Sequence, residues 1–196
     1  MAANVGRPKV ELERREQILA AFEACVIEYG LAKTTLQKVA DKAGLPRSLV
    51  RYFVGNRAEM VQLLLDRMNE KADQSIAEQF PNDPTLSELL DLIFDGAFTD
   101  NTSNLIIDQL WELSRREPAV KLQLKQLYSS LKQRITAQMR KEGLPNPSRH
   151  ADIAQCLIAL GYGEACFEDL GMKTRRRNTS RVCADVLLAQ LGETKE

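Results

Sequence analysis

The spacing of the apolar residues limits the possible folds of this chain more than any other feature. Apolar side chains recur every three or four residues, for example at Val120, Leu124, Leu127 and Leu131. This period matches one face of an α-helix, whereas a half-buried strand alternates apolar and polar residues. Such alternation is absent from the sequence, and the glycines and prolines fall between the stripes. We therefore expect an all-α fold.

The breaking and capping residues divide the sequence into nine expected helices. After a polar arm at residues 1–10, they cover about residues 11–29, 34–43, 46–54, 56–80, 85–98, 101–115, 118–141, 148–170 and 179–191. Two starts carry a capping box, in which a Thr or Asn is followed three residues later by a Gln or Glu. The pairs are Thr34 with Gln37 and Asn56 with Glu59. We expect a helix to begin at each of them.

Charge is unevenly distributed along the chain. The whole sequence has 27 Lys and Arg and 27 Asp and Glu, so its formal net charge is zero. Residues 1–57 carry ten basic and six acidic side chains, a net charge of +4, which leaves −4 for the remainder. A basic segment on an acidic body favours a polyanionic partner for that segment alone, although chance variation accounts for the imbalance equally well.

The most informative segment is residues 34–57. Two short helices joined by a tight turn at Ala43-Gly44-Leu45 have the dimensions of a helix-turn-helix. The second helix buries an apolar side, and its other side shows Arg47, Ser48, Arg51 and Tyr52. Guanidinium groups pair with guanine, hydroxyls bind phosphates, and a ring packs on a sugar or a thymine methyl. The segment favours DNA binding, and the alternative is an ordinary helical hairpin with a solvated polar face.

The run TTLQKVADKAGLPRSLVRYFVGNRAEM resembles the DNA-binding signature of the TetR (tetracycline-repressor-like) family. The resemblance covers residues 11–60, and the length and all-helical remainder also fit. Arg51, Val54 and Pro46 depart from the residues common in the family, so base preference cannot be read. The resemblance implies a helix-turn-helix DNA-binding domain of three helices at residues 1–55. It also implies a helical effector-binding and dimerisation domain at residues 56–196.

Family roles carry over to matching positions of this sequence. The resemblance implies phosphate contacts at the start of the second helix and of the fourth, and base or groove contacts along the third. These residues are Thr34, Thr35, Arg47, Ser48, Arg51, Tyr52 and Arg57. In addition, Arg7 in the basic arm could enter an adjacent minor groove, where narrow A·T tracts attract Arg. The alternative is a solvated arm.

A small-molecule effector site is expected in the C-terminal domain. The helix at 101–115 is apolar on two sides, as in a helix that lines a cavity or is buried all round. An acid beside an indole could receive a cationic ligand. The candidate residues are Phe94, Phe98, Asp108, Trp111 and Tyr128. Simple core packing explains the same pattern equally well.

The family resemblance also implies a homodimer, in which the last two long helices of each subunit pair. Here these are the helices at 148–170 and 179–191. A stripe of small and apolar residues on the first would allow close approach: Ala154, Leu157, Ile158, Gly161 and Ala165. The partner stripe on the second would be Val182, Val186 and Ala189.

Several classes of protein are not favoured by the sequence. The four cysteines form no C-x-x-C pair and no run reaches the length of a membrane span, so we expect a reduced, cytoplasmic protein without a membrane partner. One histidine, His150, expected at the surface, gives no metal-ligand spacing, and no nucleophile elbow is present. We expect no enzyme, metal or cofactor. The alternatives are a constitutive DNA-binding protein without an effector, and a helical interaction module or enzyme that does not bind DNA.

Overall fold

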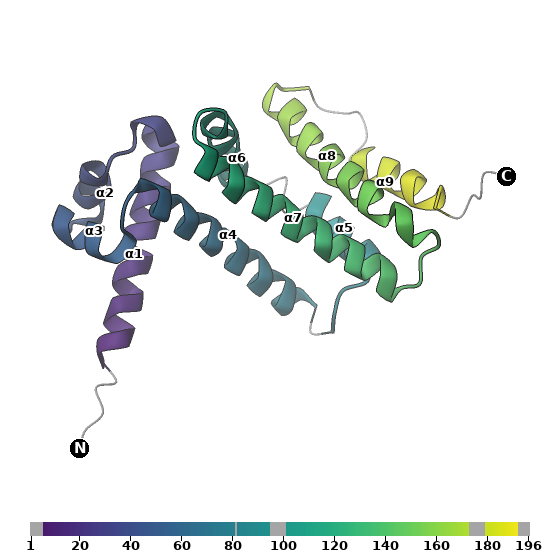
Figure 1. Ribbon diagram of the computed structural model, residues 1–196, viewed down its shortest axis with the longest axis horizontal. Coiled ribbons are helices and arrows are strands. Elements are labelled where there is room, and N and C mark those ends of the chain that lie inside the picture. Colours follow the sequence, from purple (N-terminus) through teal and green to yellow (C-terminus); the bar gives the residue numbers. More distant parts are fainter. Residues whose placement is uncertain (1–5, 81, 95–100, 173–178, 192–196) are drawn as a thin grey trace, which may run out of the picture. The chain divides into compact units, whose positions relative to one another are not determined.

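The computed structural model describes residues 6–80, 82–94, 101–172 and 179–191, and within these ranges all regular structure is helical (Figure 1). The elements are α1 (Gly6–Tyr29), the 3-10 helix η1 (Leu31–Lys33), α2 (Leu36–Ala43), α3 (Arg47–Val54), α4 (Arg57–Gln79), α5 (Leu86–Leu92), α6 (Asn101–Ser114), α7 (Pro118–Lys141), the 3-10 helix η3 (Pro147–Arg149), α8 (His150–Asp169) and α9 (Thr179–Ala189). The predicted all-α fold is confirmed, and most helix ends agree with the sequence to within a few residues.

The start of α1 differs from the prediction. The helix begins at Gly6, so Arg7 lies in its first turn and not in an arm that precedes it. Pro8 is tolerated there because the first backbone N–H groups of a helix have no partner within the helix. The predicted polar arm at residues 1–10 is therefore wrong from Gly6 onward.

The chain divides into two compact units, which are described separately. The head unit is residues 1–71 and 105–124, and the body unit is residues 72–104 and 125–196. The division passes within α4, α6 and α7, whereas the sequence suggests a boundary at residue 55. The reason lies in hydrogen bonds that join Gln123 of α7 to the first turn of α4, and α6 to the turn after α1.

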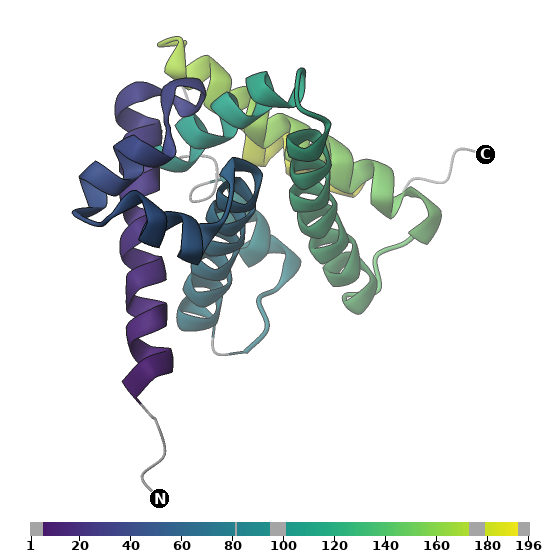
Figure 2. The ribbon, with the colours of Figure 1, turned by 60° about the vertical axis from the view of Figure 1, so that its left-hand side comes forward.

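The head unit is built around the C-terminal half of α1, against which α2 and α3 pack (Figures 1 and 2). Its interior is formed by apolar side chains from α1 to α4. These include Ile18, Phe22, Cys25, Val26, Val39, Val50, Val54 and Met60. Each large apolar side chain that leaves water contributes about 1.5–3 kcal/mol to folding. Burial also raises the pKa of the Cys25 thiol.

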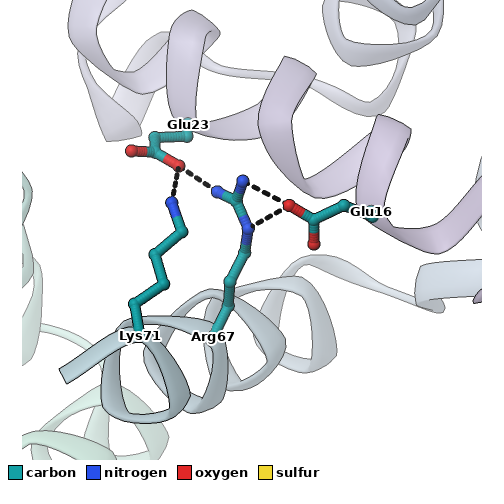
Figure 3. Close-up of polar contacts among 4 residues, drawn as sticks. All are labelled: Glu16, Glu23, Arg67 and Lys71. Carbon is teal, nitrogen blue, oxygen red and sulfur yellow. Dashed lines mark hydrogen bonds and ion pairs between the residues drawn. The ribbon is translucent and has the colours of Figure 1, made fainter. Parts of the chain in front are cut away.

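An ion cluster joins α4 to α1 inside the head unit (Figure 3). The Arg67 guanidinium donates from Nε to Glu16 Oε1 at 2.8 Å and also pairs with Glu23, which Lys71 approaches at 3.9 Å. The side chain of Arg67 is only 12% exposed. Burial alone would lower the pKa of Arg67, but the two carboxylates outweigh it and raise that pKa. The cluster therefore fixes the long α4 helix on α1 by charged hydrogen bonds.

The body unit has its own core, formed by α5, α7, α8 and α9. The residues buried there include Leu90, Phe94, Ile135, Met139, Ala154, Leu157, Ile158, Ala184 and Leu191. Arg181 of α9 donates to Asp91 Oδ1 at 2.6 Å and to Ser87 Oγ at 2.7 Å, which joins α9 to α5. His150, predicted to be solvated, is fully buried, with Nε2 3.0 Å from the Pro145 carbonyl oxygen.

The predicted dimer stripe on α8 is wrong. Ala154, Leu157, Ile158, Gly161 and Ala165 are all buried within the subunit. Small residues suit close packing against a neighbouring helix of the same chain as well as against a second copy, and the sequence alone does not distinguish the two. The other side of α8 is exposed, as are Val182, Val186 and Ala189 of α9.

Candidate nucleic-acid interface

The turn between α2 and α3 depends on Gly44. This residue has φ 65° and ψ 33°, a left-handed backbone conformation that residues with a Cβ rarely adopt. Its N–H donates to the Asp41 carbonyl at 3.2 Å, and Leu45 N–H donates to the Ala40 carbonyl at 3.0 Å. This pair of bonds is a Schellman motif, which ends a helix and satisfies its last carbonyls. The predicted tight turn at Ala43-Gly44-Leu45 is confirmed.

The cap of α2 is one residue later than predicted. Thr35 is the N-cap, and its hydroxyl accepts from Lys38 N–H at 3.3 Å. Thr34 is buried instead, and its single hydroxyl hydrogen is shared between the Gly30 carbonyl at 2.8 Å and the Cys25 carbonyl at 3.1 Å. The predicted capping box of Thr34 with Gln37 is therefore wrong. A hydroxyl committed to two carbonyls inside the head unit is also not placed to bind a phosphate.

The third helix has one apolar and one polar face, as the sequence predicts. Val50 and Val54 are fully buried, while Leu49 and Phe53 are half-buried. Arg47, Ser48 and Arg51 are exposed. Tyr52 is 74% exposed and meets the Phe53 ring edge-on, with ring centroids 5.2 Å apart. The four predicted contact residues thus share the open face of α3.

The start of α4 follows α3 through Gly55 and a capping box. Asn56 Oδ1 accepts from Ala58 N–H at 2.8 Å and Glu59 N–H at 3.1 Å, and Glu59 Oε2 accepts from Asn56 N–H at 2.7 Å. The predicted cap is confirmed. Arg57, the next residue, is half-buried, and its Nη2 donates to the Leu31 carbonyl at 3.1 Å. In this position the guanidinium binds the protein's own backbone.

The basic residues of α2 are partly engaged by α1. Lys42 Nζ lies 2.7 Å from Glu28 Oε2, and this hydrogen bond raises the pKa of Lys42 and lowers that of Glu28. Lys38 Nζ lies 4.3 Å from the centre of the Tyr29 ring. The polar residues of α3 are therefore the stronger candidates for contacts with a nucleic acid.

Comparisons with known proteins bear on this arrangement. No family model matches the sequence. The chain is 41% identical over 70 residues to the HTH-type transcriptional regulator TtgR of Pseudomonas putida, a match that covers 35% of this chain and 33% of TtgR. The chain spans between a third and about half of the length of the curated relatives it matches.

Solved structures extend the likeness beyond this region. A TetR transcription regulator from Haloarcula marismortui matches with a TM-score of 0.76 and 19% sequence identity, over 91% of this chain and 98% of that one. The chain has the TetR-regulator fold. The multidrug binding protein EbrR in complex with ethidium has the same arrangement, with a TM-score of 0.66 and 19% identity over 89% of this chain and 98% of EbrR. TtgR and the Haloarcula protein are named as regulators of transcription, and none of the three is named as an enzyme.

The predicted effector residues of this TetR fold are not brought together within one described unit. Asp108 and Trp111 belong to α6 in the head unit, where Asp108 is half-buried and Trp111 is 42% exposed. Phe94 and Tyr128 pack in the core of the body unit. Phe98 lies outside the described residues. A shared effector pocket therefore remains a prediction.

Two glutamines that sequence reasoning missed hold the head unit together. The Gln109 amide of α6 accepts from Leu31 N–H and donates to the Val26 carbonyl at 3.3 Å. Gln123 of α7 donates to the Ala58 carbonyl at 3.2 Å. The only local signal for Gln109 is a polar residue between the fully buried Ile106 and Leu110. Among the described residues, no group of metal-ligating side chains gathers and no helix is long and apolar enough to cross a bilayer.

Proposed function

We propose that this protein is a transcriptional repressor that binds a palindromic DNA operator as a homodimer and is released by a small-molecule effector. The observation that carries the proposal is the open face of α3, which presents Arg47, Ser48, Arg51 and Tyr52 on a helix whose other face is buried. The identity to TtgR and the likeness to TetR-regulator structures support it.

In this proposal α3 enters the major groove of the operator. Arg47 and Arg51 reach base edges, where a guanidinium can bind guanine with two hydrogen bonds. Ser48 donates to a phosphate, and Tyr52 packs on a sugar or a thymine methyl. The N-terminus of α2 beside Thr35 offers backbone N–H groups to a phosphate. Arg57 donates from Nη2 to the Leu31 carbonyl and would bind a phosphate through its other N–H groups, and Arg7 would contact the minor groove from the first turn of α1.

The homodimer is proposed to form through the exposed sides of α8 and α9. On α8 this side carries the exposed Cys156 and Ala159, the half-buried Gly163 and, at the end of the helix, the exposed Phe167 and Leu170. On α9 it carries Val182, Val186 and Ala189. Exposed apolar stripes of this kind are a common mark of protein interfaces. A twofold dimer would hold two copies of α3 near the ~34 Å spacing of successive major grooves.

The effector is proposed to act by binding one conformational state of the dimer more tightly than the other. EbrR, which has the same fold, is described as a multidrug binding protein with ethidium bound, and this supports an aromatic or cationic class of effector. Trp111 is the single tryptophan of the chain and should report such binding by fluorescence if it lines the site. Asp108→Asn should then weaken a cationic effector and leave a neutral one unchanged.

The test of DNA binding is selection from a randomised duplex library, followed by anisotropy with the selected duplex. We expect Arg51→Ala to weaken binding by about 1–3 kcal/mol and to change the selected sequence, because a base contact is lost. The matched control is Arg140→Ala, an exposed arginine of α7. Failure of the unmodified protein to enrich any sequence would refute the proposal.

A further inference from the structure

The turn that joins α1 to α2 is held by side chains from three places in the head unit. It begins at Gly30, whose φ of 80° turns the chain sharply after α1, and it ends at Thr35, the cap of α2. Thr34 binds it from within through the carbonyls of Cys25 and Gly30. The position of this turn sets where α2 starts, and through the Gly44 turn it sets where α3 lies.

Gln109 of α6 closes this turn from outside. Its amide oxygen accepts from Leu31 N–H, and its amide nitrogen donates to the Val26 carbonyl in the last turns of α1. One side chain thus forms hydrogen bonds with both the end of α1 and the start of η1. A Cβ on Gly30 would lie 3.5 Å from the Gln109 oxygen, which is ordinary van der Waals contact, so the Gln109 side chain lies directly beside this turn.

Arg57 of α4 binds the same residue on its other side. Its Nη2 donates to the Leu31 carbonyl at 3.1 Å, while its buried Nε has no hydrogen-bond partner among the described residues. Leu31 is only 2% exposed, so water cannot replace either bond in place. We call Leu31, Gln109 and Arg57 the Leu31 clasp. Through it, side chains of α6 and α4 both form hydrogen bonds with the backbone of Leu31, which precedes α2.

We infer that the Leu31 clasp couples α6 to the DNA-reading helices, with Gln109 as its positioning residue. The inference rests on the proposed function. A shift of α6 removes the acceptor of Leu31 N–H and the donor to Val26, and the turn before α2 must then rearrange. By linkage, fixing α3 on DNA must in turn stabilise α6, because coupling between two sites is reciprocal. Regulation of DNA binding therefore passes through a hydrogen-bonded contact.

The experiment is hydrogen exchange measured by mass spectrometry, with and without a saturating amount of the library-selected duplex. Saturation removes any effect of altered affinity. We expect DNA to slow exchange in peptides from α3 and, by roughly 5- to 150-fold, in peptides from α6. Gln109→Met, similar in length and unable to form either hydrogen bond, should keep the protection of α3 and lose that of α6. Its melting temperature checks that it is folded.

Two further variants distinguish coupling from a general loss of packing. Gln109→Glu keeps an acceptor for Leu31 N–H and loses the donor to Val26, so it should retain part of the α6 protection. Gln126→Met, the same change at an exposed position of α7, should behave as the unmodified protein. The inference would be overturned if DNA did not protect α6 in the unmodified protein, or if α6 were equally protected in Gln109→Met. In either case, protection of α3 would still support DNA binding. Absence of α3 protection would instead overturn the proposed function.

Discussion

The helices α3 and α8 have similar inner faces and different outer ones. Both bury aliphatic side chains, such as Val50 and Val54 on α3 and Leu157 and Ile158 on α8. Toward solvent, α3 presents guanidinium groups and a tyrosine, whereas α8 presents Cys156, Ala159 and, at its end, Phe167, which is 56% exposed. The inner faces explain folding in both cases. The proposed function accounts for the difference between the outer faces, because a polyanion is recognised by charge and hydrogen bonds, and a protein surface by apolar contact.

The largest effect is expected when a charge is placed on the outer face of α8. Ala159→Asp would bring a carboxylate and its symmetry mate into an apolar interface, which costs about 3–5 kcal/mol. The dimer dissociation constant measured by light scattering should rise at least ~100-fold. Ala151→Asp, an exposed alanine off the stripe on the same helix, is the control. An unchanged dimer in Ala159→Asp would place the interface elsewhere.

The next largest effect concerns stability, and it should differ between an ion pair of the head unit and an ion pair of the body unit. Arg67→Met in the head unit should lower the free energy of unfolding by about 1.5–3 kcal/mol, because Glu23 loses a partly buried charged partner. Arg134→Met in the body unit removes an ion pair with Asp73 that is half exposed, and should cost less than ~1 kcal/mol. Denaturant unfolding measures both. Equal costs would show that the Arg67 cluster is no more than a surface contact.

A smaller effect is expected at the turn that orients α3. Gly44→Ala should cost about 1–2 kcal/mol, because alanine is strained in the left-handed conformation. A Cβ there would meet no atom within 4 Å, so the cost comes from the backbone alone. Urea unfolding measures the change. A neutral substitution would mean that the turn relaxes freely, and that α3 is less firmly oriented than its contacts suggest.

The smallest expected difference is in the reactivity of cysteines, which can be measured without altering stability. Cys25 is buried in the head unit with its thiol pKa raised, while Cys156 and Cys183 are exposed on α8 and α9. A thiol reagent should modify Cys156 quickly in dilute protein and more slowly as protein concentration favours the dimer. Cys25 should react only on unfolding. Reaction of Cys156 that is independent of concentration would remove it from the interface.

The fold was predictable because periodicity and capping residues report local physics. The stripes of α7 and the glycines at positions 44 and 55 each act within a few residues, so one sequence suffices to place them. The N-cap of α2 was predicted at Thr34 and lies at Thr35. Either threonine can cap a helix, and only the burial of Thr34 decides between them.

The candidate site was predictable in part for the same reason. The open face of α3 follows from helical spacing alone. The Leu31 clasp does not follow from local spacing, because Gln109 lies 78 residues from Leu31 and no nearby sequence pattern predicts the contact. The dimer stripe predicted on α8 is buried within the subunit, because small residues favour close packing without specifying the neighbour. Contacts distant in sequence are what a local pattern leaves undetermined.

In the proposed function, α3 binds DNA while the outer faces of α8 and α9 bind a second copy. Hydroxyl-radical footprinting on the library-selected duplex tests both parts together. We predict two protected half-sites on one face of the duplex, about 10–10.5 base pairs apart from centre to centre. Arg51→Ala should weaken both at equal protein concentration. A single protected half-site would contradict the proposed dimer, and no protection where the unmodified protein is in excess would contradict DNA binding by α3.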